Sequence, residues 1–191
     1  MEQHDPELVI HPSQCTDVET GLRTLLRIHK LLTYLSVHNI TKLVETLPKI
    51  HMYTSKLRMC CVEEQMRFDE FILDHYPPGL YRDDMSSKVL DGNVLPRCLR
   101  NITTMATRTD EITEHVQRNF LSTPVVDPNY VSIVTAVYID VCRNIERQLE
   151  LWQRIKAKEQ RELSMLAYEK CLFEREQLFM NPTSTSDIVW P

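Results

Sequence analysis

Glycine is scarce in this chain, which has only three among its 191 residues. Loops that hold phosphates, dinucleotide-binding turns and nucleophile elbows all need glycine where the backbone approaches a ligand closely. Gly21, Gly79 and Gly92 lie far apart and form none of these motifs. Tight turns between strands also favour glycine. The shortage of glycine, together with abundant Leu, Glu, Arg and Met, therefore predicts an all-α protein.

A basic patch and a long apolar run are also missing. The net charge is −5 and the densest basic segment is the modest RIKAKEQR at 154–161, whereas nucleic-acid binding needs clustered positive charge. The longest uncharged apolar run, YVSIVTAVYI at 130–139, is shorter than the roughly 18 residues of a membrane span. The N-terminus is polar and acidic, unlike a signal peptide. We therefore expect no nucleic-acid partner, no transmembrane segment, no secretion, and a cytoplasmic or nuclear location.

Motifs for metal binding and catalysis are not found. No histidine follows a glutamate by three residues, as di-iron bundles require, and H-E-x-x-H is absent. Glu111 and His115 share one helical face, for which a solvated surface is the favoured interpretation. The cysteines form no C-x-x-C pair and are expected to be small apolar side chains in a reducing compartment. We expect no enzyme activity, no cofactor, no metal and no small-molecule substrate.

Hydrophobic spacing predicts two helices in the first part of the chain. The segment TDVE at 16–19 matches a capping box formed by Thr16 and Glu19, and the apolar stripe that follows fades near His38. A second helical stretch covers about 41–75, where Pro48 either starts a new helix or kinks a continuous one. The segment HYPPGLYRDD at 75–84 then ends this helix, and we interpret it first as a hinge, with a contact loop as the alternative.

The second part of the chain contains two longer predicted helices. One covers about 94–121, with Pro96 in its first turn. The other begins after Asp127, which is a good N-cap before Pro128, and reaches Met180. Residues 130–141 also fit the alternation of a strand, but their apolar spacing continues into a clearly helical sequence, so we prefer a helix.

The predicted lengths leave the last helix partly without a partner. At 1.5 Å per residue, the helices at 49–75 and 94–121 are each about 40 Å long, whereas 129–180 spans close to 80 Å. An isolated helix is marginal in water, and the unpaired half still carries large apolar side chains. The segment KAKEQRE at 156–162 interrupts the stripe, which disfavours a regular homodimeric zipper. The candidate partner-binding residues on this helix are Trp152, Ile155, Leu163, Leu166, Tyr168, Leu172, Phe173 and Phe179.

The C-terminal segment TSTSDIVWP ends with three apolar residues, Ile188, Val189 and Trp190, that have no evident core to join. Such a segment fits docking into a partner, either as an added strand or as an aromatic anchor. The alternative is that it packs on its own bundle or is a disordered end. The chain is thus divided into a flexible N-terminus at 1–15, a helical bundle and coiled-coil unit at 16–180, and a flexible tail at 181–191.

The sequence favours an elongated antiparallel helical bundle with a long C-terminal coiled-coil-like helix. Its expected role is a non-enzymatic scaffold subunit of a hetero-oligomeric complex, whose partners are other helical proteins. One alternative is a membrane-associated helical module in vesicle trafficking, because RIKAKEQR could touch an anionic surface, although peripheral membrane contact is not favoured. Another is a compact helical enzyme or metal carrier. For the architecture, the alternative is a last helix that folds back into a compact monomeric bundle.

Overall fold

The structure is a computed structural model that describes residues 11–75, 94–123 and 125–180, without the side chains of Ile72, His75 and Leu166. The described residues contain helices and no β-strand, so the predicted all-α class is confirmed. The segments predicted as a flexible start, a hinge and a tail lie wholly or largely outside the described residues. The helices are η1 (Pro12–Gln14), α1 (Val18–His38), α2 (Ile40–Thr46), η2 (Leu47–Lys49), α3 (Ile50–His75), α4 (Val94–Ser122) and α5 (Pro128–Met180), where η marks a 3-10 helix.

The chain divides into two compact units, Met1–Gln153 and Arg154–Pro191. The first unit contains α1 to α4 and α5 as far as Gln153. The second contains the remaining residues of α5. The predicted start, end and helical state of α5 are confirmed, and the helix continues through the segment where a fold-back was the alternative.

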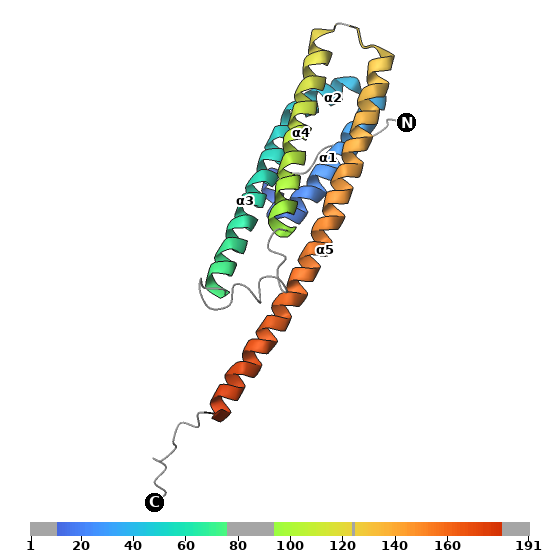
Figure 1. The fold of residues 1–191 in the computed structure, drawn as a ribbon. Helices are drawn as coiled ribbons and strands as arrows, with labels where there is room; N and C mark the ends of the chain where they lie inside the picture. Colours follow the sequence, from blue (N-terminus) through green and yellow to red (C-terminus); the bar gives the residue numbers. More distant parts are fainter. Residues whose placement is uncertain (1–10, 76–93, 124, 181–191) are drawn as a thin grey trace, which may run out of the picture. The chain divides into compact units, whose positions relative to one another are not determined.

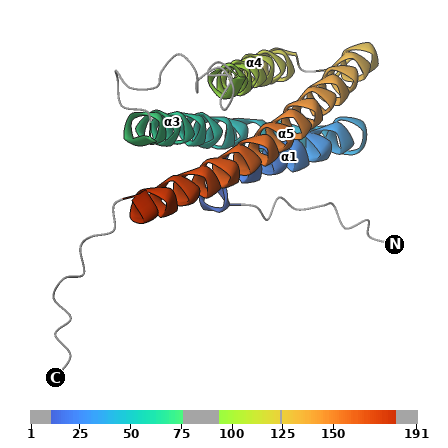
Figure 2. The ribbon, with the colours of Figure 1, turned by 60° about the horizontal axis from the view of Figure 1, so that its bottom comes forward.

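Four long helices pack together in the first unit, as Figures 1 and 2 show for α1, α3, α4 and the start of α5. Two hydrogen bonds show the relative direction of α1 and α5. Ser36 of α1 lies 2.6 Å from Thr135 of α5, measured between the two hydroxyl oxygens. Near the other end of α1, the side chain of Gln153 donates to Glu19, so α1 and α5 run antiparallel.

The start of α1 differs from the sequence prediction by one residue. Asp17, rather than Thr16, is the N-cap: its Oδ1 accepts from the backbone N–H of Thr20 at 2.7 Å, and Thr20 Oγ1 accepts from the backbone N–H of Asp17 at 3.1 Å. The predicted capping box of Thr16 and Glu19 was wrong, because a carboxylate is an equally good cap and Glu19 instead binds Arg23 at 2.7 Å.

Two breaks separate α1, α2 and α3. Asn39 closes α1 through its backbone N–H, which donates to Leu35 at 2.8 Å, and opens α2 through its side chain, which accepts from Lys42 at 3.0 Å. Pro48 lies in η2, between α2 and α3. It therefore stands where a new helix begins, because proline lacks the N–H that a continuous helix would require.

The core is formed mainly by the apolar stripes that the sequence predicts. Gly21 lies where α1 approaches α3, and a Cβ atom there would be 2.9 Å from Leu57 Cδ1, so glycine permits this close approach. The buried apolar residues of α1 are Val18, Leu22, Leu25, Ile28, Leu32 and Leu35, and those of α5 are Val134, Tyr138, Val141, Cys142, Ile145, Leu149 and Trp152. None of the described helices is both long and apolar enough to cross a membrane.

Candidate partner-binding surface

The part of α5 that belongs to the second unit begins with charged turns. Lys156 Nζ lies 2.9 Å from Glu159 Oε2, and Lys158 Nζ lies 3.6 Å from Glu162 Oε1. Both pairs are three or four residues apart, a spacing that places side chains beside each other on a helix. These pairs lie in KAKEQRE at 156–162, the segment that interrupts the apolar stripe of this helix.

After these turns, large apolar side chains line one face of the helix. Met165, Tyr168, Leu172 and Phe179 are exposed, and we name these four residues the α5 seam. They are separated by three, four and seven residues, which are a and d positions of a heptad. At about 100° per residue, all four lie within an arc of about 60°. This is the spacing with which a helix packs against another helix.

The remaining d position of the α5 seam holds Arg175. Its guanidinium carbon lies 5.9 Å from the ring centroid of Phe179, which is a cation–π contact. The aliphatic stem of an arginine also covers neighbouring apolar surface while its charged end stays in water. Arg175 therefore interrupts the apolar character of the seam without breaking its spacing.

The two edges of the α5 seam differ in charge. Glu169 and Glu176 occupy successive e positions, so one edge is acidic. The opposite edge carries Cys171 and Leu178 at g positions, and both are exposed and uncharged. Residues at e and g face the partner helix across a coiled-coil interface and set which partner is preferred. An acidic edge is complementary to a helix with Lys or Arg at the facing positions.

The structure places the sequence-predicted residues of α5 in different surroundings. Trp152 is only 4% exposed and lies in the core of the first unit, where it extends the buried stripe of Ile145 and Leu149. It is therefore not available to a partner, and we exclude it from the binding surface. Ile155 and Leu163 are half-buried.

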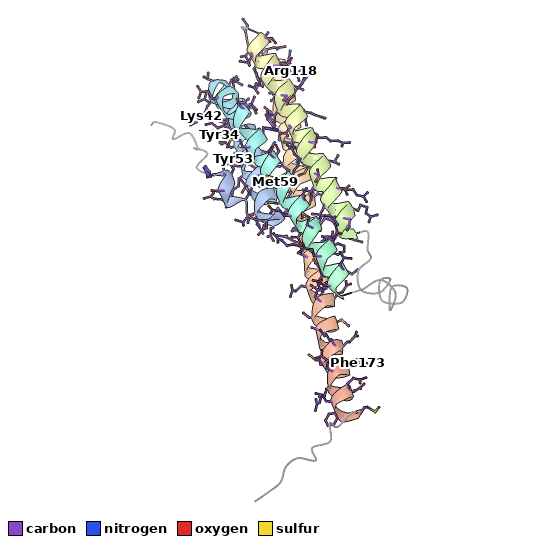
Figure 3. The ribbon with its side chains drawn as sticks, turned by 90° about the vertical axis from the view of Figure 1, so that its left-hand side faces the viewer. Tyr34, Lys42, Tyr53, Met59, Arg118 and Phe173 are labelled. Atoms are coloured by element: carbon purple, nitrogen blue, oxygen red, sulfur yellow. The ribbon has the colours of Figure 1, made fainter. Side chains whose placement is uncertain are left out.

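The other predicted residues fall into two groups. Tyr168, Leu172 and Phe179 lie together on the α5 seam. Phe173, labelled in Figure 3, is exposed but lies off the seam, because successive residues of a helix point about 100° apart. The side chain of Leu166 is not described, and the predicted contact residues of the tail, Ile188, Val189 and Trp190, lie outside the described residues.

In the part of α5 that belongs to the second unit, sequence reasoning missed three exposed apolar residues, Met165, Leu178 and Met180. For Met165, the signal was present, because this residue precedes Tyr168 by three positions and Leu172 by seven. A search for heptad positions would have found it, whereas a search for the strongest continuous stripe from Trp152 onward did not.

The cysteines are free thiols. Cys171 is exposed, and the other five are buried, as expected for small apolar side chains. Burial raises the pKa of the Cys61 thiol to about 12 and that of Cys98 to about 11. These two thiols therefore stay protonated at neutral pH, where only a thiolate is an effective nucleophile. Within the described ranges, no three His, Cys, Asp or Glu side chains come together to hold a metal ion.

Comparison with known proteins gives no match to a family model, to a curated protein or to a solved structure.

Proposed function

We propose that this chain is a non-enzymatic helical scaffold subunit of a hetero-oligomeric complex, and that the α5 seam binds a partner helix. The observation that carries the proposal is the heptad spacing of large exposed side chains, with Tyr168 at 66% and Phe179 at 75% exposure. Single apolar residues on a surface are ordinary, but a contiguous row of them marks an interaction site. The heptad spacing indicates that the partner is a helix.

The small size of the α5 seam limits the binding free energy that its four residues can supply. Full burial of one large apolar side chain contributes about 1.5–3 kcal/mol, so four contribute roughly 6–12 kcal/mol before costs. Loss of translational and rotational freedom on association costs about 4–15 kcal/mol. These terms nearly cancel, so a stable complex needs contacts beyond the four seam residues. The acidic edge and the half-buried neighbours Ile155 and Leu163 are the nearest candidates.

The charge of the seam edges favours a different chain as the partner. If two copies paired antiparallel through the α5 seam, Glu169 and Glu176 of each copy would face the same residues of the other. If they paired in parallel, these glutamates would face Cys171 and Leu178, which offer no charge. Only a partner with a basic edge gives attraction along the interface.

The absence of a cysteine pair joined by a disulfide favours a cytoplasmic or nuclear location for this assembly. All six cysteines are free thiols, including exposed Cys171. Disulfides form and persist in oxidising compartments, whereas thiols are maintained in the cytosol and nucleus. We therefore include this location in the proposal.

The proposal is tested by purifying tagged chain from its native cells and quantifying the copurifying proteins by mass spectrometry. The test variant is Leu172→Asp, which places a charge in the middle of the α5 seam. The control is Gln177→Asp, which places the same charge on an exposed position of the same helix outside the seam. Circular dichroism of both purified variants checks that helix content is unchanged.

We expect the wild-type chain and Gln177→Asp to retain a defined set of stoichiometric helical partners, and Leu172→Asp to lose at least nine-tenths of them. Equal recovery of these partners with both variants would show that the seam is not the binding surface. A wild-type chain that copurifies with no stoichiometric partner would contradict the scaffold function itself.

A further inference from the structure

A serine, a histidine and an aspartate form a connected row of polar contacts between α3 and α4, two helices that pack side by side (Figures 1 and 2). Ser55 Oγ lies 3.5 Å from His51 Nε2, and His51 Nδ1 lies 3.3 Å from Asp110 Oδ2. We name these three residues the Ser55 row. Nucleophilic hydroxyls in proteins are activated by the same order of groups, a hydroxyl, an imidazole and a carboxylate. The Ser55 row therefore has the arrangement of a reactive serine.

The Ser55 row is accessible from solvent and depends on the fold. His51 and Ser55 are four residues apart, a spacing that places their side chains beside each other on one face of α3. Asp110 comes from α4, 59 residues after His51, so the row is assembled only in the folded chain. The His51 side chain is 69% exposed and Ser55 is half-buried. A small reagent can therefore reach the hydroxyl and the imidazole.

Asp110 is held in place and sets the tautomer of His51. Its Oδ1 accepts from the Thr54 hydroxyl at 2.5 Å, and its Oδ2 accepts from Arg58 Nη1 at 2.7 Å. A carboxylate paired with a guanidinium accepts hydrogen bonds and donates none, so His51 donates to it from Nδ1–H. The other ring nitrogen, Nε2, is then unprotonated and faces the Ser55 hydroxyl as an acceptor. Asp110 is thus a positioning residue, and His51 is the base.

Arg58 places a positive group beside the serine. Its Nη2 donates to Ser55 Oγ at 3.2 Å. A donor in this place stabilises the negative charge that develops when a serine attacks a carbonyl group. The 3.5 Å between Ser55 Oγ and His51 Nε2 is longer than an ideal hydrogen bond, as is common in unliganded sites, where such contacts shorten once a substrate is bound.

From this geometry we infer that Ser55 is a modification site that accepts an acyl group from small activated esters or thioesters. Ser55 Oγ attacks the carbonyl carbon while His51 Nε2 takes the hydroxyl proton. The bond from the carbonyl carbon to the leaving oxygen or sulfur then breaks, and the leaving group takes the proton from His51. The acyl group stays on Ser55 as an ester. This reaction modifies the chain itself and requires no turnover, so it is independent of the α5 seam and of the proposed scaffold function.

The reactivity of Ser55 is tested on the purified full chain with two reagents. One is a fluorophosphonate probe, which activated serines attack at phosphorus with loss of fluoride. The other is p-nitrophenyl acetate, an activated acyl donor. Peptide mass spectrometry follows the labelling rate of each serine. Ser164 is the internal reference, because it is exposed on α5 and its hydroxyl donates to the Gln160 carbonyl rather than to a base.

We expect Ser55 to react with both reagents at least tenfold faster than Ser164. His51→Gln should remove at least nine-tenths of this excess, because glutamine is polar but cannot take the proton. The matched control is His115→Gln, which changes an exposed histidine of α4 outside the Ser55 row and should leave the excess intact. Circular dichroism checks that both variants are folded.

Equal rates at Ser55 and Ser164 in the wild type would overturn the inference, as would an excess that persists in His51→Gln or disappears in His115→Gln. A further measurement needs no variant. Unfolding the wild type in urea separates Asp110 from His51, so the two serines should then react at equal rates. An excess at Ser55 that persists in the unfolded chain would also overturn the inference.

The positioning role of Asp110 is tested by nitrogen–proton NMR correlations of the His51 ring. We expect the wild type to carry the ring proton on Nδ1, and Asp110→Ala to move it toward Nε2, since the acceptor is lost. Thr54→Val is the control, because it removes a hydrogen bond from the same carboxylate but leaves the Oδ2 that faces His51. A ring proton on Nε2 in the wild type would overturn the inference, because the ring would then offer no acceptor to Ser55.

Discussion

His29 is expected to make the stability of the fold depend strongly on pH. Its side chain is 1% exposed, and its Nδ1 lies 2.9 Å from the backbone oxygen of Leu25, to which it donates. The ring meets that of Tyr138 edge to face, with 6.1 Å between ring centroids. Burial disfavours the charged imidazolium and lowers the pKa of His29 from 6.5 to about 4, although the hydrogen bond to Leu25 acts in the opposite direction.

The sign of the effect follows from the two pKa values. Between pH 6.5 and pH 4, the unfolded chain binds a proton at His29 that the folded chain does not bind. The contribution of neutral His29 to the free energy of unfolding is therefore complete above pH 6.5. It is lost as the pH falls toward 4. Since one pKa unit corresponds to about 1.4 kcal/mol, this lowered pKa amounts to about 3 kcal/mol of unfolding free energy.

Urea unfolding of the wild type and of His29→Leu at pH 7 and pH 4.5 tests this prediction. Leucine fills a similar apolar volume but does not titrate, and the other histidines and the carboxylates titrate in both proteins. We expect the wild type to lose about 2–3 kcal/mol more than the variant between the two pH values. Equal losses in both proteins would show that His29 is not held neutral by burial.

Three further predictions concern stability, each measured by urea unfolding at pH 7. Tyr138→Phe should leave stability unchanged or raise it by up to about 2 kcal/mol, because the Tyr138 hydroxyl is buried without a hydrogen-bond partner; a marked loss would reveal a bond that the structure lacks. Asp110→Asn should cost about 1–3 kcal/mol, since this carboxylate is largely buried and lies 2.7 Å from Arg58; a cost near zero would contradict its role in joining α3 to α4. Asp17→Ala should cost about 1 kcal/mol and Thr16→Ala much less, and the reverse order would restore the capping box predicted from sequence.

Local signals in the sequence predicted the helices well. Asp127 and Pro128 mark the start of α5, and Asn181 with Pro182 follows its last residue, Met180. The three-four spacing from Val18 to Leu35 predicted the buried face of α1. These features are encoded within a few residues of each helix end or along one helix face, so one sequence is enough to read them.

The sequence did not predict which side chains of some helices are buried, because burial depends on tertiary contacts. Trp152 fits the spacing of an exposed seam, but its burial depends on helices that are distant in sequence. Thr109 and Thr113 are polar, yet both are buried, and the Thr113 hydroxyl donates to the Thr109 carbonyl at 2.8 Å. The exposed apolar side chains of α3, among them Met59 and Met66, were overlooked because the buried stripe of the same helix, centred on Leu57, dominates its pattern. Whether a helix face is buried depends on the other helices that pack against it. The sequence of one helix does not contain this information.

Hydrogen exchange with mass spectrometry tests the central claim most directly. The chain is measured alone and in the complex purified from its native cells. We expect amides of residues 165–179 to exchange quickly in the free chain, because a solvated helix opens readily, and to exchange much more slowly in the complex. The amides around Tyr138 serve as an internal reference, since they are protected in both samples. Equal exchange of residues 165–179 in the two samples would contradict the account, because the α5 seam would then not be where the partner binds.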